Sequence, residues 1–258
     1  MNIILLEPSE LSPSGEVTLT DHRARHLTKV LRVKPGDSVR VGVLDGACGS
    51  GHITTLAAHN VTLVCRCEDA PPPAGTDTLL LAFARPKVLL RCLEHATALG
   101  FGRIVLFRSR RVEKSHLSSH ALEPAVIEDR LRRGLEQSRR TIRPILHFVP
   151  RFRQLIAETL DQLVPPQNRF VADADAEEEA ALAHFAPGGS SLVIGPEGGL
   201  IPHELEQFSL HGFRLVRAGR QPLRVETALA YLAGQLRAAQ TRGAAQPAGA
   251  AQPAGAAT

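Results

Sequence analysis

No apolar run in this 258-residue sequence approaches the roughly 20 residues that a membrane-spanning helix needs. The N-terminus has no basic segment ahead of an apolar one, and Glu7 and Glu10 follow early, which is unlike a secretory signal peptide. The four cysteines are too few and too scattered for a disulfide scaffold. These absences exclude membrane and disulfide-rich secreted classes, and they predict a cytoplasmic globular protein.

Several motifs that mark catalytic or metal sites are also missing. The chain has no Walker A loop and no G-x-G-x-x-G, which disfavours an NTPase and a Rossmann dehydrogenase. It has no G-x-S-x-G and no H-E-x-x-H. Cys65 and Cys67 share one face of an expected strand, but no second Cys or His pair has zinc-site spacing. We therefore expect no metal.

Lysine is scarce, because 26 of the 30 basic residues are arginine. Between Arg85 and Arg153 the chain carries 16 basic and 6 acidic residues, whereas the whole chain has a net charge of only +4. The planar guanidinium makes bidentate contacts with phosphate, so this concentration favours a polyanionic partner. Composition alone leaves open the alternative of solvated helix faces in a protein from a GC-rich genome.

The proline-rich stretch DAPPPAGT (69–76) predicts a stiff linker between two parts of the chain. Over residues 1–70, five short strands and one helix predict a small, partly closed barrel. The expected strands are 3–6, 16–19, 39–44, 51–56 and 61–67, and the expected helix is 22–31. AAQPAG occurs twice over residues 244–255, and this composition predicts a disordered tail over residues 243–258, without an assigned function.

From residue 77 to residue 242, strands and helices alternate, which predicts a mainly parallel sheet covered by helices on both faces. The expected strands are 78–84, 104–107, 145–149, 170–172, 192–194 and 214–216. The expected helices are 88–99, 122–139, 152–163, 177–184, 202–211 and 225–239. Ligands of such sheets bind at the carboxyl ends of the strands, so the loops there are the place to look for a site.

Two loops at expected strand ends carry the strongest local signals. SLVIGPEGGL (191–200) runs from a buried strand into three glycines and Glu197, which suits close approach of a ligand to the backbone. RAGRQPLR (217–224) leads into the last expected helix. Arg224 and Glu226, at the start of that helix, could face the loop of residues 195–199, which is called the glycine loop below. The plainer alternatives are an ordinary strand-to-helix turn for the first loop and capping charges for the second.

Two arginine-rich segments, FRSRRVEK (107–114) and LRRGLEQSRRTIR (131–143), place like charges close together. Like charges at helical spacing cost stability unless they are neutralised. This favours contact with RNA phosphates over a solvated face.

The order of these pieces resembles bacterial 16S rRNA uracil-N3 methyltransferases of the RsmE type, within the SPOUT superfamily. Seven segments carry the resemblance in the family's order: RHLTKVLRVKPGD (25–37), ARPK (84–87), EHATALG (94–100), SRRVEKS (109–115), EQSRR (136–140), IGPEGGL (194–200) and LRVETALAYLAGQ (223–235).

The resemblance implies a PUA-like β-barrel that binds RNA (1–70) and an α/β SPOUT domain with a trefoil knot (77–242). It implies a homodimer that uses S-adenosylmethionine to methylate N3 of a specific uridine in 16S rRNA of the small ribosomal subunit. The alternatives are a non-enzymatic rRNA-binding or ribosome-assembly protein, and a SPOUT methyltransferase that acts on another RNA.

The resemblance also assigns residues. The cofactor would lie against Ala172, Ile194, Gly195, Pro196, Glu197, Gly198, Gly199, Val216, Ala218, Gly219 and Leu223. The RNA would contact Arg25, Arg32, Lys87, Arg110, Arg111, Lys114 and Arg140.

Catalysis needs the N3 proton removed and the charge on O2 and O4 stabilised. Arg224 is the first candidate for stabilising that charge, and Arg139 or Arg140, from the other subunit, is the next. Glu226 and Glu197 are the candidate bases.

Overall fold

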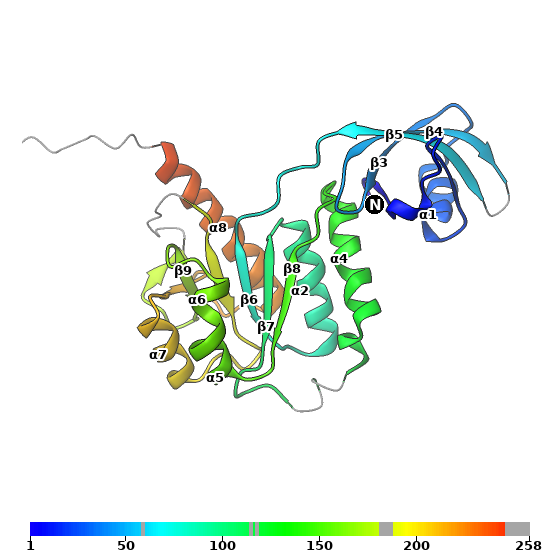
Figure 1. Cartoon of the computed structure of the whole chain (residues 1–258). Helices are drawn as coiled ribbons and strands as arrows, with labels where there is room; N and C mark the ends of the chain where they lie inside the picture. Colours follow the sequence, from blue (N-terminus) through cyan, green and yellow to red (C-terminus); the bar gives the residue numbers. More distant parts are fainter. Residues whose placement is uncertain (58–59, 114–115, 117–118, 181–187, 246–258) are drawn as a thin grey trace, which may run out of the picture.

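The computed structural model describes residues 1–57, 60–113, 116, 119–180 and 188–245. Figure 1 shows a smaller body of curled strands at one end of a larger body, in which helices flank a central sheet. Within the described ranges, no helix combines the length and apolar character needed to cross a bilayer.

The smaller body is a curled five-stranded sheet with the order β1-β3-β4-β5-β2. β1 runs parallel to β3 and the other pairs are antiparallel. Alternating apolar residues turn one face inward, where Leu6, Leu19, Leu27, Ile53 and Leu63 are buried together. Its elements are β1 (Ile4–Leu6), η1 (Pro8–Glu10), β2 (Glu16–Leu19), α1 (His22–Arg25), η2 (His26–Leu31), β3 (Ser38–Val43), β4 (Cys48–Leu56) and β5 (Val61–Asp69).

The larger body is built on a seven-stranded parallel sheet with the order β10-β12-β9-β11-β6-β7-β8. Its first half comprises β6 (Thr78–Ala82), α2 (Pro86–Ala98), β7 (Arg103–Phe107), η3 (His120–Leu122), α4 (Pro124–Ser138), β8 (Ile145–Val149), α5 (Phe152–Gln154), η4 (Leu155–Thr159) and α6 (Leu160–Leu163). Its second half comprises β9 (Arg169–Ala172), β10 (Glu178–Glu179), β11 (Ser191–Ile194), α7 (Pro202–Leu210), β12 (Arg214–Arg217) and α8 (Val225–Ala245).

Helices cover both faces of this sheet (Figure 1). One core packs α2, α4 and α8 against the sheet, with Leu93, Leu131 and Leu229 in the same cluster. The other core packs the helical segment after β8 and α7 against the opposite face, through residues such as Leu155 and Phe208. Because the strands are parallel, their carboxyl ends share one edge of the sheet. The predicted α/β class, with a small β-barrel ahead of a parallel sheet, is confirmed.

The helix expected over 177–184 is wrong where the structure describes it. Glu178–Glu179 form the edge strand β10, which pairs with Val216 and Arg217 of β12. Ion pairs from Arg214 to Glu178 (3.3 Å) and from Arg217 to Glu179 (3.0 Å) hold this strand. Pairing with a neighbouring strand therefore overrides the local helix propensity of an Ala- and Glu-rich segment. Residues 181–184 lie outside the described residues.

The last helix is longer than expected. It continues to Ala245, into the segment predicted as a tail, and residues 246–258 lie outside the described part of the chain.

The two bodies meet along the second half of α4. The amide of Asn2 donates to the carbonyl of Glu136 (2.8 Å), and Leu135 packs in one buried cluster with Ile3 and Leu5. Glu136 is 4% exposed, and burial raises the pKa of its carboxyl to about 7, against the opposing effect of nearby cations that include Arg132.

This buried carboxyl should make the junction less stable as pH rises. Folding raises the pKa of Glu136 above its unfolded value of 4.5, so the folded chain binds the extra proton between about pH 4.5 and 7 and loses stability across that window. Glu136→Gln lacks this loss. The difference in unfolding free energy between the variant and wild type should therefore shift by about 1–3 kcal/mol in favour of the variant from pH 5 to pH 8. Urea unfolding at both pH values measures it, with the exposed Glu158→Gln as control. An equal difference at both pH values would contradict the prediction.

Candidate active site

A cavity of about 120 Å³ lies where β9, β11 and β12 end, and it is called the inner cavity below. Nine of the predicted cofactor residues line it: Ala172, Ile194, Gly195, Pro196, Gly199, Val216, Ala218, Gly219 and Leu223. The remaining lining residues were not predicted: Asp173, Ala174, Gln221, Pro222, Val225, Ala228 and Leu232. The spacing of three and four residues between positions 225, 228 and 232 places them on one face of α8, so helical periodicity could have predicted these three.

The glycine loop between β11 and α7 forms one wall of the inner cavity. Gly199 has a φ of +72°, which favours glycine, and its amide donates to the carbonyl of Pro196 (2.8 Å) to close a tight turn. A Cβ on Gly195 would lie 3.2 Å from the backbone nitrogen of Leu200. The loop therefore depends on two of its glycines for its shape, and these leave backbone exposed to a ligand.

Glu197 and Gly198, the other two predicted cofactor residues, point elsewhere. A carboxylate oxygen of Glu197 accepts a hydrogen bond from the amide of Arg85 (3.0 Å). The carbonyl of Gly198 accepts one from the guanidinium of Arg111. These contacts tie the glycine loop to the loops that follow β6 and β7.

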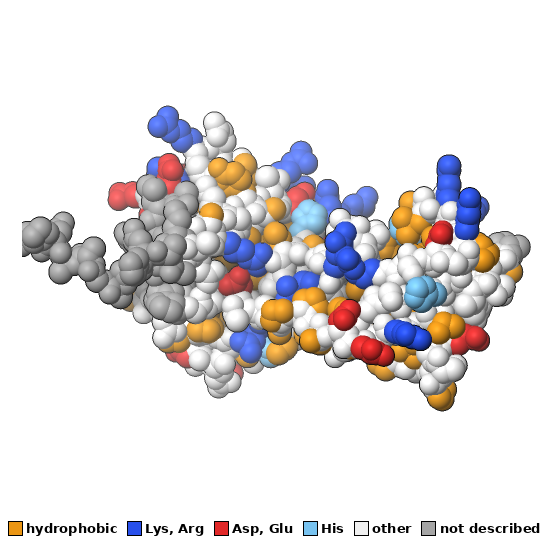
Figure 2. All heavy atoms as spheres, turned by 90° about the horizontal axis from the view of Figure 1, so that it is seen from above, with side chains coloured by type: hydrophobic (Ala, Val, Ile, Leu, Met, Phe, Trp, Pro, Cys, Tyr) orange, Lys and Arg blue, Asp and Glu red, His pale blue; other side chains and the backbone are white. Residues whose placement is uncertain are grey.

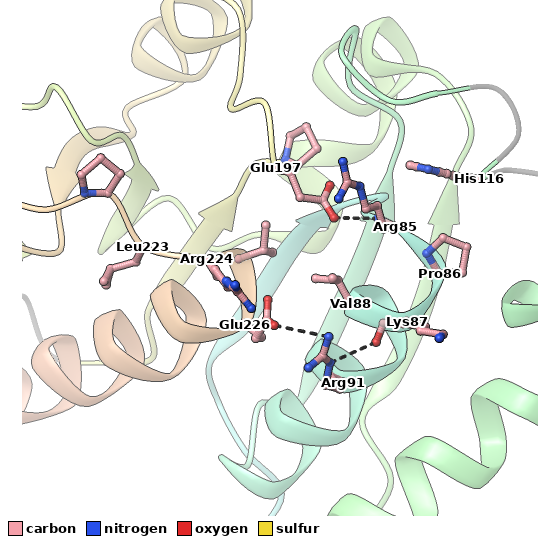
Figure 3. A pocket seen from close by; sticks show the side chains of 13 residues that line it. Arg85, Pro86, Lys87, Val88, Arg91, His116, Glu197, Leu223, Arg224 and Glu226 are labelled. Atoms are coloured by element: carbon pink, nitrogen blue, oxygen red, sulfur yellow. Dashed lines mark hydrogen bonds and ion pairs between the residues drawn. The ribbon is translucent and has the colours of Figure 1, made fainter.

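A larger cavity of about 930 Å³, the outer cavity, lies between the start of α2, the glycine loop and the start of α8 (Figure 3). It shares four lining residues with the inner cavity, which makes the two spaces contiguous: Pro196, Pro222, Leu223 and Val225. Its other lining residues are Arg85, Pro86, Lys87, Val88, Arg91, His116, Glu197, Arg224 and Glu226.

Charged groups of both signs face the outer cavity. Glu226 is 13% exposed, and its carboxylate lies 3.6 Å from the guanidinium of Arg91, which also donates to the carbonyl of Lys87 (3.4 Å). Figure 3 shows Arg224 beside this pair, at the start of α8. Arg224 is exposed and has no ion pair within the described ranges. The cavity thus combines a shielded carboxylate with a guanidinium that remains available to a ligand.

Cys92 is fully buried, close enough to Glu226 and Glu197 for their charges to act on its thiol. Burial raises the pKa of its thiol to about 12, and the negative charges of Glu226 and Glu197 add to the effect. The thiol stays protonated near neutral pH, so Cys92 is a packing residue rather than a nucleophile.

The structure does not bring Arg139 to this site within one chain. Arg139 follows α4, and Arg140 lies beside Gly100, at the end of α2 remote from the outer cavity. The 13 residues of α2 separate the two ends by about 20 Å. A catalytic role for Arg139 would therefore need a second copy of the chain.

The predicted RNA contacts fall in several places. Lys87 lines the outer cavity, whereas Arg110 and Arg111 are exposed on the loop after β7. Arg25 and Arg32 are exposed on the smaller body.

Two further predicted RNA contacts differ from these. Arg140 is half-buried and donates to the carbonyl of Pro73 (2.5 Å), which ties it to the linker. Lys114 lies outside the described residues. Seen from above in Figure 2, Lys and Arg side chains project from both bodies rather than from one alone.

The family model described as RNA methyltransferase domain matches residues 72–237, and the model described as RNA methyltransferase PUA domain matches residues 19–64. The chain is 29% identical over 232 residues to ribosomal RNA small subunit methyltransferase E of Treponema pallidum, covering 88% of this chain and 87% of that protein. It is 26% identical to the protein of that name in Mycobacterium bovis, covering 91% of each.

Solved structures agree with this. The structure of ribosomal RNA small subunit methyltransferase E from Neisseria gonorrhoeae, bound to S-adenosyl methionine, has a TM-score of 0.69 and 25% identity, covering 94% of this chain and 98% of that one. A putative methyltransferase from Legionella pneumophila has a TM-score of 0.71 at 20% identity, covering 92% of this chain and 97% of its own. With two contiguous cavities at the strand ends and a family model that spans most of its length, the chain belongs to the RNA methyltransferase family, as a member of the RsmE type with a SPOUT fold.

Proposed function

We propose that this protein transfers a methyl group from S-adenosylmethionine to N3 of one uridine, 1498 in the usual numbering, in 16S rRNA of the small ribosomal subunit in the cytoplasm. Residues 1–70 serve as a PUA-like RNA-binding domain, residues 77–242 form the methyltransferase domain, and the residues after α8 have no assigned role. The active form is a homodimer. The observation that carries the proposal is the inner cavity opening into a charged outer cavity.

The inner cavity has the chemistry that S-adenosylmethionine requires. Its glycine loop presents backbone at Gly195 and Gly199, its α8 wall is apolar at Ala228 and Leu232, and Asp173 adds a carboxylate at the end of β9. Backbone groups and a carboxylate suit the polar amino-acid and ribose parts, and the apolar wall suits the adenine. When bound, S-adenosylmethionine supplies a sulfonium methyl that uracil N3 takes up as the carbon–sulfur bond breaks.

The outer cavity supplies the groups that activate the base. Uracil N3 keeps its proton at neutral pH, and its lone pair is delocalised, so the proton must leave and the charge on O2 and O4 must be stabilised. Glu226 accepts the proton and passes it to water. Arg224 donates hydrogen bonds to the developing oxyanion. Glu226 is better shielded from water than Glu197, because its side chain is 13% exposed whereas Glu197 lies in the exposed class.

N3 lies on the Watson–Crick edge, so the target base has to be unpaired or swung out of its stack. The outer cavity is large enough for one extruded base, and Lys87 and Arg85 lie at its mouth for the flanking backbone. Basic residues on both bodies are available to hold the surrounding RNA.

Primer extension tests the proposal directly. A methyl on N3 blocks base pairing, so reverse transcriptase should stop one nucleotide before the target. We expect a new stop near the 3′ end of 16S rRNA after incubation with enzyme and S-adenosylmethionine, using RNA from a strain that lacks this protein. The stop should be absent without S-adenosylmethionine. No stop on free rRNA or on assembled small subunits, with label instead in another RNA, would overturn the assigned substrate.

A further inference from the structure

A third cavity, of about 390 Å³, opens at the carboxyl ends of β7 and β8, on the face of the sheet that α5 and α7 cover. Three arginines line it: Arg108, Arg110 and Arg151. Phe152 forms an apolar part of its wall. Of the residues that the structure describes, none lines both this cavity and the inner or outer one. It is called the arginine cavity below.

No carboxylate in the part of the chain that the structure describes neutralises the three guanidinium groups. None of them has an ion-pair partner among the residues that the structure describes. The carboxylate in the wall, Glu204, is 2% exposed, and its two oxygens accept hydrogen bonds from the amides of Arg110 (2.8 Å) and Ile201 (3.0 Å). Glu204 therefore holds the β7 loop against the start of α7, and the cavity keeps an excess of positive charge.

A buried hydroxyl lies in the same wall. Ser109 is 1% exposed, and its Oγ makes no hydrogen bond with any residue that the structure describes. An unsatisfied buried hydroxyl destabilises the fold, and a ligand oxygen in the cavity would remove that cost. Three free guanidinium groups and one unpaired hydroxyl donor together match the oxygens of a phosphate group.

The position of the arginine cavity indicates which molecule would supply a bound phosphate. Arg110 lines this cavity, while the next residue, Arg111, donates to the carbonyl of Gly198 in the glycine loop. The loop after β7 therefore spans from the arginine cavity to the glycine loop, which lines the inner and outer cavities. A nucleic-acid strand that reaches the outer cavity can place a neighbouring phosphate here.

We propose that the arginine cavity binds a backbone phosphodiester of the RNA substrate, on a nucleotide that flanks the methylated base. Arg108, Arg110 and Arg151 contact the phosphate oxygens, and Ser109 donates a hydrogen bond to one of them. This inference rests on the proposed function in taking the bound polyanion to be the RNA substrate.

Arg151→Ala tests the proposal, because Arg151 is exposed and its loss removes one guanidinium without disturbing the core. The matched control is Arg153→Ala, which removes an exposed arginine two residues away that lines none of the three cavities. Filter binding of a 3′ fragment of 16S rRNA is measured over a series of salt concentrations. We expect Arg151→Ala to bind about tenfold more weakly and to lower the slope of log K against log salt by about 0.7.

Arg153→Ala should keep the wild-type slope, and both variants should keep the wild-type affinity for S-adenosylmethionine. Ser109→Ala should also weaken RNA binding, but with an unchanged slope, because it removes no charge. A slope for Arg151→Ala equal to that of wild type overturns the proposal. So does a calorimetric titration in which inorganic phosphate binds wild type but not Arg151→Ala while the two bind RNA equally, since the cavity would then be a free-phosphate site.

Primer extension on wild-type reactions separates this inference from the proposed function. If Arg151→Ala lowers the slope of log K against log salt but wild type produces no reverse-transcriptase stop, the phosphate site is retained and the assigned reaction is overturned. A stop together with an unchanged slope would retain the reaction and overturn the phosphate site.

Discussion

Arg224→Ala is expected to lower the turnover of methyl transfer by about 10²–10³-fold, with the Kd for S-adenosylmethionine changed by less than about twofold. Arg224 lines the outer cavity and not the inner one, so its loss should affect the developing charge on the base rather than the cofactor. Single-turnover methylation at saturating RNA measures the first quantity, and calorimetry measures the second.

The same loop offers a control. Arg220 is exposed and lines neither cavity, so Arg220→Ala should retain wild-type turnover. Arg224→Lys should recover part of the rate, because it restores the charge but not the bidentate geometry. If Arg224→Ala weakens cofactor binding as much as it slows turnover, Arg224 is a binding residue and the oxyanion role is wrong.

Ala228→Leu is expected to weaken S-adenosylmethionine binding by about 5- to 150-fold, the range that corresponds to about 1–3 kcal/mol of overpacking. Ala228 is half-buried on α8 and lines the inner cavity, whose volume of about 120 Å³ leaves little room for three additional carbon atoms. Alanine and leucine both favour helix, so α8 should persist.

Ala238→Leu, an exposed site farther along α8, makes the same change away from the cavity and should bind the cofactor normally. Thermal unfolding of both variants shows whether the fold is retained. Normal cofactor binding by Ala228→Leu would show that S-adenosylmethionine does not occupy the inner cavity.

Local sequence signals were most reliable where hydrophobic periodicity and turn residues agreed. The strand over 145–149 and the helix beginning at Pro202 occur where they were predicted. IGPEGGL lies at the carboxyl end of a buried strand, as three glycines and an adjoining apolar run indicated. The segment 177–184 failed because its Glu-rich start pairs with β12, a partner that is distant in sequence.

The site itself was only partly accessible from the sequence. Nine predicted cofactor residues line one cavity, and Arg224 and Glu226 line the next. The resemblance groups Arg139 with them, yet in one chain it lies at the far end of α2. Arg151 lies outside every segment that the sequence singles out, and Ser109 opens SRRVEKS without a role assigned to it.

The sequence by itself determined the division at the proline-rich linker, the alternation that specifies a parallel sheet, and the glycine loop at a strand end. These are properties of short stretches, set by the side-chain period, proline stereochemistry and glycine conformational freedom. Only the tertiary structure decided which loops share an edge, which of two adjacent arginines faces the glycine loop, and which buried hydroxyl is left unpaired. Those outcomes depend on strand order and side-chain packing between segments far apart in the chain, which no local pattern encodes.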